Sequence, residues 1–358
     1  MRKSLVRTSI VFFWVVIIFA ALYWPKWKPF HYKQNSINIF SWGDILDPTV
    51  IGDFEKKTGI KVNLNYYSSN EELLVKMKAT KGEGYDLIIP SDYAVQLLSK
   101  ENLLKKLDPS RFHFWKDINP VLTHLPFDPD NSYSIPFEWE IFGLGIDTNY
   151  FQNKQLNQSW KLIYDPSIIN YKITMINDPV EAILFTSFYL YGLVDSLEKE
   201  QVQSIKNLLF RQKKWVEAYA DFRGDYFLAT KNCPVVVSSS SYIWRTMRNF
   251  KFVGFVVPQE GTFITIENLC IPLASNKETL AYEFINYLFK AESVAAHYKT
   301  FGFFPSTMHA LHLMDLDPLA EKLIRSTPQD FEKFHLTKVL LPQQQIRDIW
   351  VEVKTKDD

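Results

Sequence analysis

Acidic, hydroxyl and aromatic side chains stand at points of the sequence where predicted strands end or predicted helices begin. In chain order, these candidate binding residues are Trp42, Ser91, Tyr93, Asp178, Glu181 and Glu267. A ring face attracts an ammonium group by about 0.5–2 kcal/mol, depending on how far the pair is desolvated. A carboxylate adds a charge-assisted hydrogen bond to the same kind of group. Because none of the six side chains is basic, the set predicts a binding site for a cationic, partly apolar solute.

Each of these residues also has a purely structural interpretation. Asp178 and Glu181 have the spacing of a helix capping box, and Ser91 is a suitable N-cap. Trp42 could belong to a core, and Glu267 could face solvent from an alternating strand. Spacing alone favours capping and core packing, and it does not decide the orientation of Glu267.

Two other acidic residues, Glu138 and Glu140, flank Trp139 shortly after Pro136. Charged residues that follow a proline are typical of a solvated turn. The sequence therefore favours a turn here over a role in ligand binding.

Motifs for enzyme chemistry are missing from the sequence. There is no Gly-x-Ser-x-Gly elbow and no phosphate-binding loop of the Walker type. The serine run 238–241 follows a predicted strand, but no histidine stands at a spacing that would activate it. His309 and His312 are three residues apart on a helical pattern, without a third metal ligand nearby. The sequence therefore predicts a non-enzymatic protein without a cofactor or a metal site.

The first half of the chain alternates strands and helices. Predicted strands cover 37–42, 60–67 and 85–89, and predicted helices cover 47–59, 69–77 and 93–100. Asp47 and Pro48 are suited to be the N-cap and first residue of a helix that Gly59 ends. Strands separated by helices predict a parallel, doubly wound sheet. Ligands bind beyond the carboxyl ends of such strands, which is where Trp42 and Ser91 stand.

The second half repeats this alternation. Predicted strands cover 171–176, 235–239, 250–257 and 262–271, and predicted helices cover 178–191, 197–219, 277–288, 292–300 and 344–354. No low-complexity linker and no internal repeat separates the halves. We therefore expect an α/β protein of two lobes, whose chain crosses between the lobes more than once.

The composition excludes several classes of protein. The chain has 358 residues, of which 47% are hydrophobic, and 40 Lys and Arg stand against 40 Asp and Glu. This is the composition of a globular protein that is long enough for two lobes. A net charge of zero argues against nucleic acid as a partner, because neutralising phosphates requires an excess of Lys and Arg.

Residues 1–24 have the composition of an export signal. Basic residues at positions 2, 3 and 7 precede a run of 13 apolar residues from Ile10 to Leu22. A basic flank and a short apolar run are typical of a cleavable signal peptide. Bulky residues stand where signal peptidase requires small ones, so an uncleaved signal anchor is the alternative. Both interpretations predict a periplasmic protein, either free or tethered to the inner membrane.

Cys233 and Cys270 are the two cysteines of the chain. They could form one disulfide in an oxidising compartment, or they could be two buried thiols in apolar surroundings. The sequence does not decide between these alternatives.

Five stretches of the chain resemble the spermidine/putrescine-binding proteins, which are periplasmic receptors of polyamine ABC transporters. They are Phe40-Ser-Trp-Gly-Asp, Phe54-Glu-Lys-Lys-Thr-Gly-Ile-Lys-Val, Tyr85-Asp-Leu-Ile-Ile-Pro-Ser-Asp-Tyr93, Pro126-Phe-Asp-Pro-Asp-Asn-Ser-Tyr-Ser-Ile-Pro136 and Leu269-Cys-Ile-Pro272. The similarity extends from about residue 37 to residue 354. It implies a type II periplasmic-binding-protein fold, in which two α/β lobes joined by crossover strands close on a polyamine. The lobes would comprise 36–141 plus 267–312, and 142–266 plus 313–358.

The resemblance also implies roles for the candidate residues. Asp178, Glu181 and Glu267 would neutralise ammonium groups. Trp42 and Tyr93 would cover methylene groups, while Ser91 would add a polar contact. The expected partners are a polyamine ligand and a membrane permease with its ATPase, and the receptor would act as a monomer.

Several positions depart from the family pattern. Ser239 and Thr265 fall where the family has tryptophans, and Phe303 falls where a tyrosine is expected. Gly43 and Ile45 stand where the family often has a hydroxyl residue and a tyrosine. With two indole rings missing, the alternative is a receptor of the same fold, or a membrane-tethered sensor, for another small cationic solute.

Overall fold

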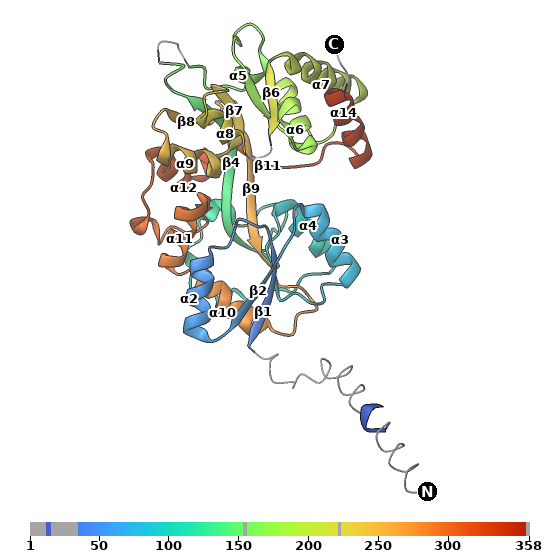
Figure 1. The fold of residues 1–358 in the computed structure, drawn as a ribbon, viewed down its shortest axis with the longest axis vertical. Coiled ribbons are helices and arrows are strands. Elements are labelled where there is room, and N and C mark those ends of the chain that lie inside the picture. Colours follow the sequence, from blue (N-terminus) through green and yellow to red (C-terminus); the bar gives the residue numbers. More distant parts are fainter. Residues whose placement is uncertain (1–11, 16–34, 153–155, 221–222, 356–358) are drawn as a thin grey trace.

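The structure is a computed structural model, and it describes residues 12–15, 35–152, 156–220 and 223–355. Most of the predicted signal segment, residues 1–24, therefore lies outside the described residues. Within the described ranges, none of the helices combines the length and the apolar composition needed to cross a bilayer. The folded part consists of two α/β lobes that are stacked along the long axis of the molecule (Figure 1).

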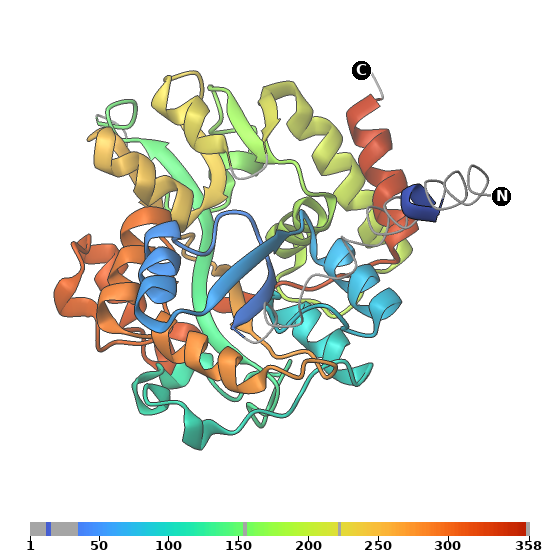
Figure 2. The ribbon, with the colours of Figure 1, turned by 60° about the horizontal axis from the view of Figure 1, so that its bottom comes forward.

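The first lobe is built on a small parallel sheet. Its strands are β1 (Ser36–Ser41), β2 (Lys61–Tyr66) and β3 (Leu87–Ile88), in the order β2–β1–β3. Its helices are α2 (Pro48–Thr58), α3 (Asn70–Thr80), α4 (Asp92–Lys100) and α10 (Glu278–Leu288). Helices α2 and α10 lie on one side of this sheet, and α3 and α4 lie on the other (Figure 2). The parallel sheet predicted for the first half of the chain is thus confirmed.

Short-range signals define the ends of helix α2. The Asp47 carboxylate accepts hydrogen bonds from the backbone N–H groups of Thr49 at 2.7 Å and Val50 at 3.3 Å. Gly59 ends the helix with a φ of 72°, a backbone conformation that glycine adopts without steric cost. Val50 and Phe54 lie on the same face, four residues apart, and both are buried against the sheet.

The second lobe contains a larger mixed sheet, in the order β11–β9–β4–β7–β5–β6. These strands are β4 (Ile135–Asp147), β5 (Ile173–Ile176), β6 (Val216–Ala220), β7 (Val235–Ser239), β9 (Thr262–Leu269) and β11 (Phe334–Leu336), and β4 also pairs with β8 (Val253–Val256) and β10 (Phe304–Pro305). The remaining helices are α5 (Lys161–Tyr164), α6 (Pro179–Tyr191), α7 (Lys199–Gln212), α8 (Gly224–Ala229), α9 (Ser240–Asn249), α11 (Ala291–Phe301), α12 (Pro318–Ile324), α13 (Pro328–Phe331) and α14 (Gln343–Thr355).

Strands β4 and β9 run side by side from one lobe toward the other (Figure 1). The two-lobed α/β fold with crossover strands, predicted from the resemblance, is confirmed. The residue boundaries given above for the lobes stay a prediction.

Several short elements were not predicted, and two longer stretches show why the structure differs from the predicted secondary structure. The helix expected over 197–219 ends at Gln212, and residues 216–220 form strand β6, which pairs with β5. The long strand β4 was not predicted, because its sequence is apolar on both faces apart from Glu138 and Glu140 and lacks a simple alternation. In both stretches, pairing with strands that are distant in the sequence determined the secondary structure.

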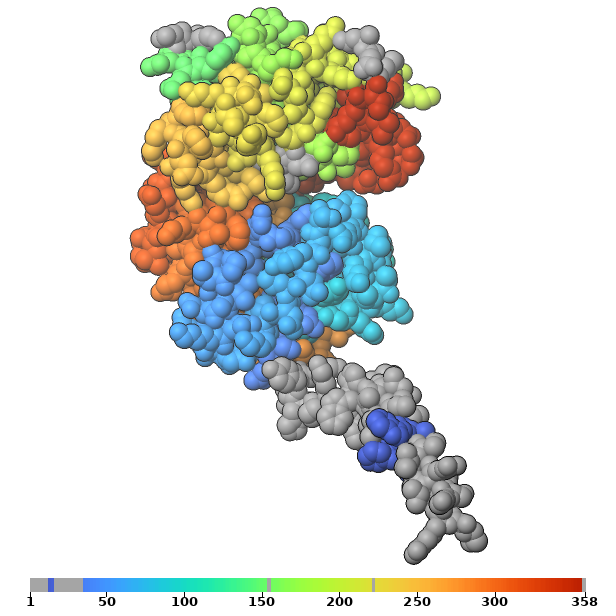
Figure 3. Space-filling model, viewed as in Figure 1, coloured from blue at the N-terminus to red at the C-terminus, as the bar shows by residue number. Residues whose placement is uncertain are grey.

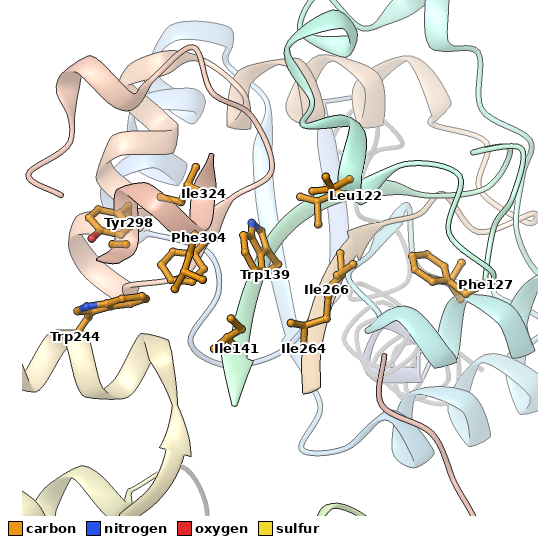
Figure 4. Packing of buried hydrophobic residues seen from close by; sticks show 14 of the residues in the cluster. Leu122, Phe127, Trp139, Ile141, Trp244, Ile264, Ile266, Tyr298, Phe304 and Ile324 are labelled. Atoms are coloured by element: carbon orange, nitrogen blue, oxygen red, sulfur yellow. The ribbon is translucent and has the colours of Figure 1, made fainter. Parts of the chain in front are cut away.

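An apolar cluster covers one face of the β4–β9 pair at the junction of the lobes (Figure 4). Trp139 and Ile141 of β4 lie beside Ile264 and Ile266 of β9 on this face, and each is at most 1% exposed. The Trp139 ring packs against Phe304, with 4.8 Å between ring centroids. Burial of each such side chain stabilises the fold by about 1.5–3 kcal/mol. This face is therefore a core, and the opposite face of the same two strands is left for other side chains.

Cys233 and Cys270 are both buried, and neither is in a disulfide. Burial raises the pKa of the Cys233 thiol to about 11. Of the two alternatives for these residues, two buried thiols is the one that the structure shows.

Candidate functional site

Glu267 lies at the junction of the lobes and brings three of the predicted residues together. The Ser91 hydroxyl donates a hydrogen bond to Oε1 of Glu267 at 2.7 Å, and the Trp42 indole N–H donates one to Oε2 at 2.9 Å. A backbone bridge also joins Ser91 to Glu267, so that the segment after β3 lies against the end of β9. The solvated orientation considered for Glu267 is wrong, because the side chain is only 8% exposed.

The environment of Glu267 disfavours its charged form. Burial raises its pKa from 4.5 to about 8, although the hydrogen bonds from Ser91 and Trp42 act in the opposite direction. Asp92 and Glu140 are nearby carboxyl groups that raise it further. None of the ion pairs among the described residues includes Glu267. Glu267 is thus a buried acid with dipolar partners and without a cationic one in that part of the chain.

Trp42 is half-buried and rests against a second aromatic ring that the sequence analysis did not include. Its ring centroid lies 4.6 Å from that of Tyr67, with an interplanar angle of 55°. The buried Tyr67 hydroxyl donates to the backbone carbonyl of Ile89, which fixes the ring that supports Trp42. Trp42 therefore serves as packing and as a partner of Glu267 at the same time.

Ser91 precedes helix α4 in the N-cap position, but its side chain makes no capping hydrogen bond. The hydroxyl is directed to Glu267 instead. Next to it, Asp92 is 1% exposed, and burial raises its pKa to about 7. The capping role considered for Ser91 is therefore wrong as far as its side chain is concerned.

Tyr93 of the first lobe has an acidic partner in its own lobe. The Tyr93 hydroxyl donates to Oε1 of Glu71 at 2.8 Å. Burial raises the pKa of Tyr93, and the negative charges of Glu71 and Asp178 raise it further. Tyr93 belongs to α4 of the first lobe, whereas Asp178 precedes α6 of the second.

Asp178 caps helix α6, as its spacing predicted. Its Oδ1 accepts hydrogen bonds from the backbone N–H groups of Val180 at 2.8 Å and Glu181 at 3.0 Å. Asp178 is exposed and Glu181, in the first turn, is half-buried. Capping occupies one oxygen of the Asp178 carboxylate with backbone donors and is compatible with a second role for this side chain. The structure thus places these two acids on the second lobe, while Trp42, Ser91 and Tyr93 lie on the first.

Glu138 and Glu140 are the residues that the sequence analysis missed. They belong to strand β4 and are 3% and 7% exposed, so the predicted solvated turn is wrong. In the antiparallel pairing of β4 with β9, Glu138 stands opposite Glu267, and Glu140 stands opposite Thr265. Directly paired residues point to the same face of a sheet. The available signal was the spacing of two acids at i and i+2 around a tryptophan, which places both on one face of a strand.

The same face of β4 continues into the core of the second lobe. Phe142, Leu144 and Ile146 have the same parity as Glu138 and Glu140, and they belong to that core. The two glutamates thus occupy the part of the strand between the cores of the lobes. Figure 3 shows the surface hollowed between the lobes, where α14 lies above α3 and α4.

Glu138 and Glu140 differ in their partners. Burial raises the pKa of Glu138 well above its ordinary value, and the nearby carboxyl groups of Glu267, Glu140 and Asp47 raise it further. Burial also raises the pKa of Glu140, but hydrogen bonds from two serines and the positive charge of Arg245 act against it. The Ser241 hydroxyl is one of these donors. Glu140 is therefore stabilised by groups of the protein itself.

Two of the positions that depart from the family pattern, Ser239 and Thr265, lie close to Glu140. The Ser239 hydroxyl is hydrogen-bonded to that of Ser241, which donates to the Glu140 carboxylate. Thr265 is the cross-strand neighbour of Glu140. Where the family has two indoles, this chain therefore has two hydroxyl side chains beside an additional buried acid. Among the described residues, no group of three or more His, Cys, Asp or Glu side chains is arranged to hold a metal ion. The arrangement is suited to hold an organic cation between acids and rings.

The chain is similar to several known proteins. Residues 49–318 match the family described as bacterial extracellular solute-binding protein. The chain is 26% identical over 298 residues to the spermidine/putrescine-binding periplasmic protein of Escherichia coli K12, which covers 81% of this chain and 83% of that protein. It is 25% identical over 347 residues to the putrescine/agmatine-binding protein of Pseudomonas aeruginosa, covering 90% and 92%. A solved structure of a putative spermidine/putrescine ABC transporter from Listeria monocytogenes has a TM-score of 0.77 at 26% identity, covering 90% of this chain and 99% of that one.

Proposed function

The chain belongs to the bacterial extracellular solute-binding protein family, and we propose from this premise that it captures a polyamine such as spermidine or putrescine in the periplasm. Members of this family bind solutes for ABC transporters and are not enzymes. The proposed partners are therefore the polyamine and a membrane permease with its ATPase, to which the receptor delivers the ligand as a monomer.

The observation that supports this proposal best is the buried carboxyl group of Glu267. Its two oxygens accept hydrogen bonds from Ser91 and Trp42, while no described cation pairs with it. A buried carboxylate is strongly destabilising unless it is paired, so an empty site favours the protonated acid and a filled site favours the anion. A ligand ammonium group supplies the missing positive charge.

The two lobes would contact the ligand with different groups. On the first lobe, Trp42 and Tyr93 would cover methylene groups, because flat rings bury apolar area at a low cost in conformational entropy. On the second lobe, Asp178 and Glu181 would hold another ammonium group at the beginning of α6. A ligand that contacts both lobes stabilises the closed arrangement relative to an open one.

The missing indoles favour one competing solute class. Ser239 and Thr265 offer hydroxyls in place of apolar ring faces. This favours a cation with more hydrogen-bond donors and less methylene surface than a long polyamine. A relative at 25% identity is described as a putrescine/agmatine-binding protein, so the guanidinium compound agmatine belongs in the same test.

The test is a thermal-shift and calorimetric panel of spermidine, putrescine, agmatine, lysine, γ-aminobutyrate and a sugar. A polyamine at 100 times its Kd should raise the free energy of unfolding by about 2.7 kcal/mol. No stabilisation by any polyamine at millimolar concentration would reject the proposed solute, and a shift with agmatine alone would establish the competing one.

A variant links this binding to the site. Glu267→Gln removes the charge and should weaken polyamine binding by about 30-fold or more, since loss of one partner of a buried charge pair costs at least about 2 kcal/mol. The matched control is Asp147→Asn, which alters a buried carboxylate at the far end of β4. Its affinity for polyamine should stay within about threefold of the wild type. Equal affinity of Glu267→Gln and the wild type would exclude Glu267 from the site.

A further inference from the structure

Glu138 and Glu267 form a pair of acids that are in none of the ion pairs between described residues. They stand directly opposite each other on β4 and β9, and they are 3% and 8% exposed. Cβ atoms of directly opposed residues are about 4.5–5.5 Å apart, and like charges at such positions are destabilising. Two acids in this arrangement indicate a function that outweighs the cost in stability.

The carboxyl group of Glu138 is the less satisfied of the two. Its Oε2 atom is buried and has no hydrogen-bond partner within the described part of the chain. Glu140, two residues further along the same face, has serine donors and the nearby Arg245. Buried polar atoms are almost always hydrogen-bonded. The unused oxygen of Glu138 therefore points to a donor that is not part of the protein.

We propose that Glu138 and Glu267 together hold one primary ammonium group of the ligand, which donates a hydrogen bond to each carboxyl group. This proposal rests on the proposed function, and it adds a ligand contact, Glu138, that the resemblance does not assign. A primary ammonium group carries three N–H donors on one compact charge. It can therefore reach two acids on neighbouring strands at the same time.

This pair of acids selects among amines by the number of N–H donors. Trp42 and Ser91 each use one lone pair of Glu267, so its carboxylate keeps acceptor sites for a ligand. Each methyl group added to the ammonium removes one donor and leaves the charge unchanged. The site thus favours an aliphatic amine with a primary terminus over its N-methylated analogues.

The experiment combines one variant with a series of ligands. Putrescine, its N,N′-dimethyl derivative and its N,N,N′,N′-tetramethyl derivative are titrated calorimetrically into the wild type and into Glu138→Gln. For putrescine, Glu138→Gln should weaken binding by about 20-fold, since a hydrogen bond to a charged group is lost. Across the methylated series the wild type should lose affinity stepwise, and its advantage over Glu138→Gln should shrink to about threefold or less.

The matched control is Glu140→Gln, which neutralises the neighbouring acid on the same strand and face. Because Glu140 has partners within the protein, the effect of this substitution on putrescine affinity should be at least about fivefold smaller than that of Glu138→Gln. Equal effects of the two substitutions would show a general change of electrostatic potential and would overturn the proposal.

The remaining outcomes separate this proposal from the proposed function. If the wild type binds putrescine and Glu138→Gln binds it equally well, the shared ammonium site is wrong and the polyamine receptor stands. If the wild type binds no amine at all, both are wrong. If Glu138→Gln does not fold, the methylated series on the wild type decides, because equal affinities for all three amines would overturn the proposal.

Discussion

The substitution Glu267→Gln should change how the stability of the ligand-free protein depends on pH. Burial raises the pKa of Glu267 from 4.5 to about 8 in the folded state. Between these two values the folded protein binds more protons than the unfolded chain, so the free energy of unfolding falls as the pH rises. The loss begins near pH 4.5 and is complete above about pH 8.

The size of this effect follows from the two pKa values. A difference from 4.5 to about 8 corresponds to about 5 kcal/mol at pH 9. Glutamine does not titrate, but its amide nitrogen cannot accept the hydrogen bond that Ser91 or Trp42 donates, which costs about 1 kcal/mol. Glu267→Gln should therefore be less stable than the wild type by about 1 kcal/mol at pH 4, about equally stable near pH 5, and more stable by about 4 kcal/mol at pH 9.

Urea denaturation of the ligand-free proteins from pH 4 to pH 9, followed by tryptophan fluorescence, measures this reversal. The buried acids Asp92, Glu138 and Glu140 have pKa values that are raised by burial as well, and they are present in both proteins. Removal of the Glu267 charge also removes its repulsion of Glu138, which stabilises the variant at high pH in the same direction. Glu72→Gln is the control, because hydrogen bonds from Ser68 lower the pKa of this exposed acid and its contribution is lost at low pH instead. Parallel stability curves for the wild type and Glu267→Gln would refute the reasoning.

Three further predictions concern the linkage to protons, the second lobe and the core. At pH 7, polyamine binding should release about 0.9 proton from Glu267. The number of released protons is the slope of the binding enthalpy against the ionisation enthalpy of the buffer. The same slope in Glu267→Gln would contradict a release from Glu267. Asp178→Asn keeps a capping side chain, so it should change the free energy of unfolding by less than about 0.5 kcal/mol while weakening polyamine binding about tenfold. Asp178→Ala should weaken binding as well and also cost about 1 kcal/mol of stability. If both variants bind polyamine as the wild type does, Asp178 has a capping role alone. Gly145→Ala should destabilise the fold by about 1–3 kcal/mol, measured by thermal unfolding, and leave polyamine affinity unchanged. The reason is that the added Cβ would lie 2.5 Å from Cδ1 of Ile243 and 2.8 Å from Cγ2 of Val236. An unchanged stability would show that this core can relax.

Local chemistry made part of this protein readable from its sequence. The Asp-Pro pairs at 47 and 178 begin helices as predicted, because a cap involves only backbone groups two or three residues away. The parallel sheet of the first lobe follows from the alternation of short apolar strands with helices. The boundary between α7 and β6 was not predicted, since residues 213–219 continue a helical pattern, whereas residues 216–220 adopt a strand beside β5.

The candidate site, too, could be predicted from the sequence only in part. Residue types, the places of Trp42 and Ser91 at strand ends, and the family resemblance identified Trp42, Ser91 and Glu267 as candidates. The structure joins these residues by hydrogen bonds across 225 and 176 residues of sequence. The chemical class that we propose for the ligand, a cation, follows from the amino-acid types alone. The amino-acid types did not show which glutamates are buried, because burial and cross-strand pairing depend on which strands meet. The pairing of Glu138 with Glu267 exists only because β4 and β9 cross together between two cores, and no signal within either strand specifies the partner of the other.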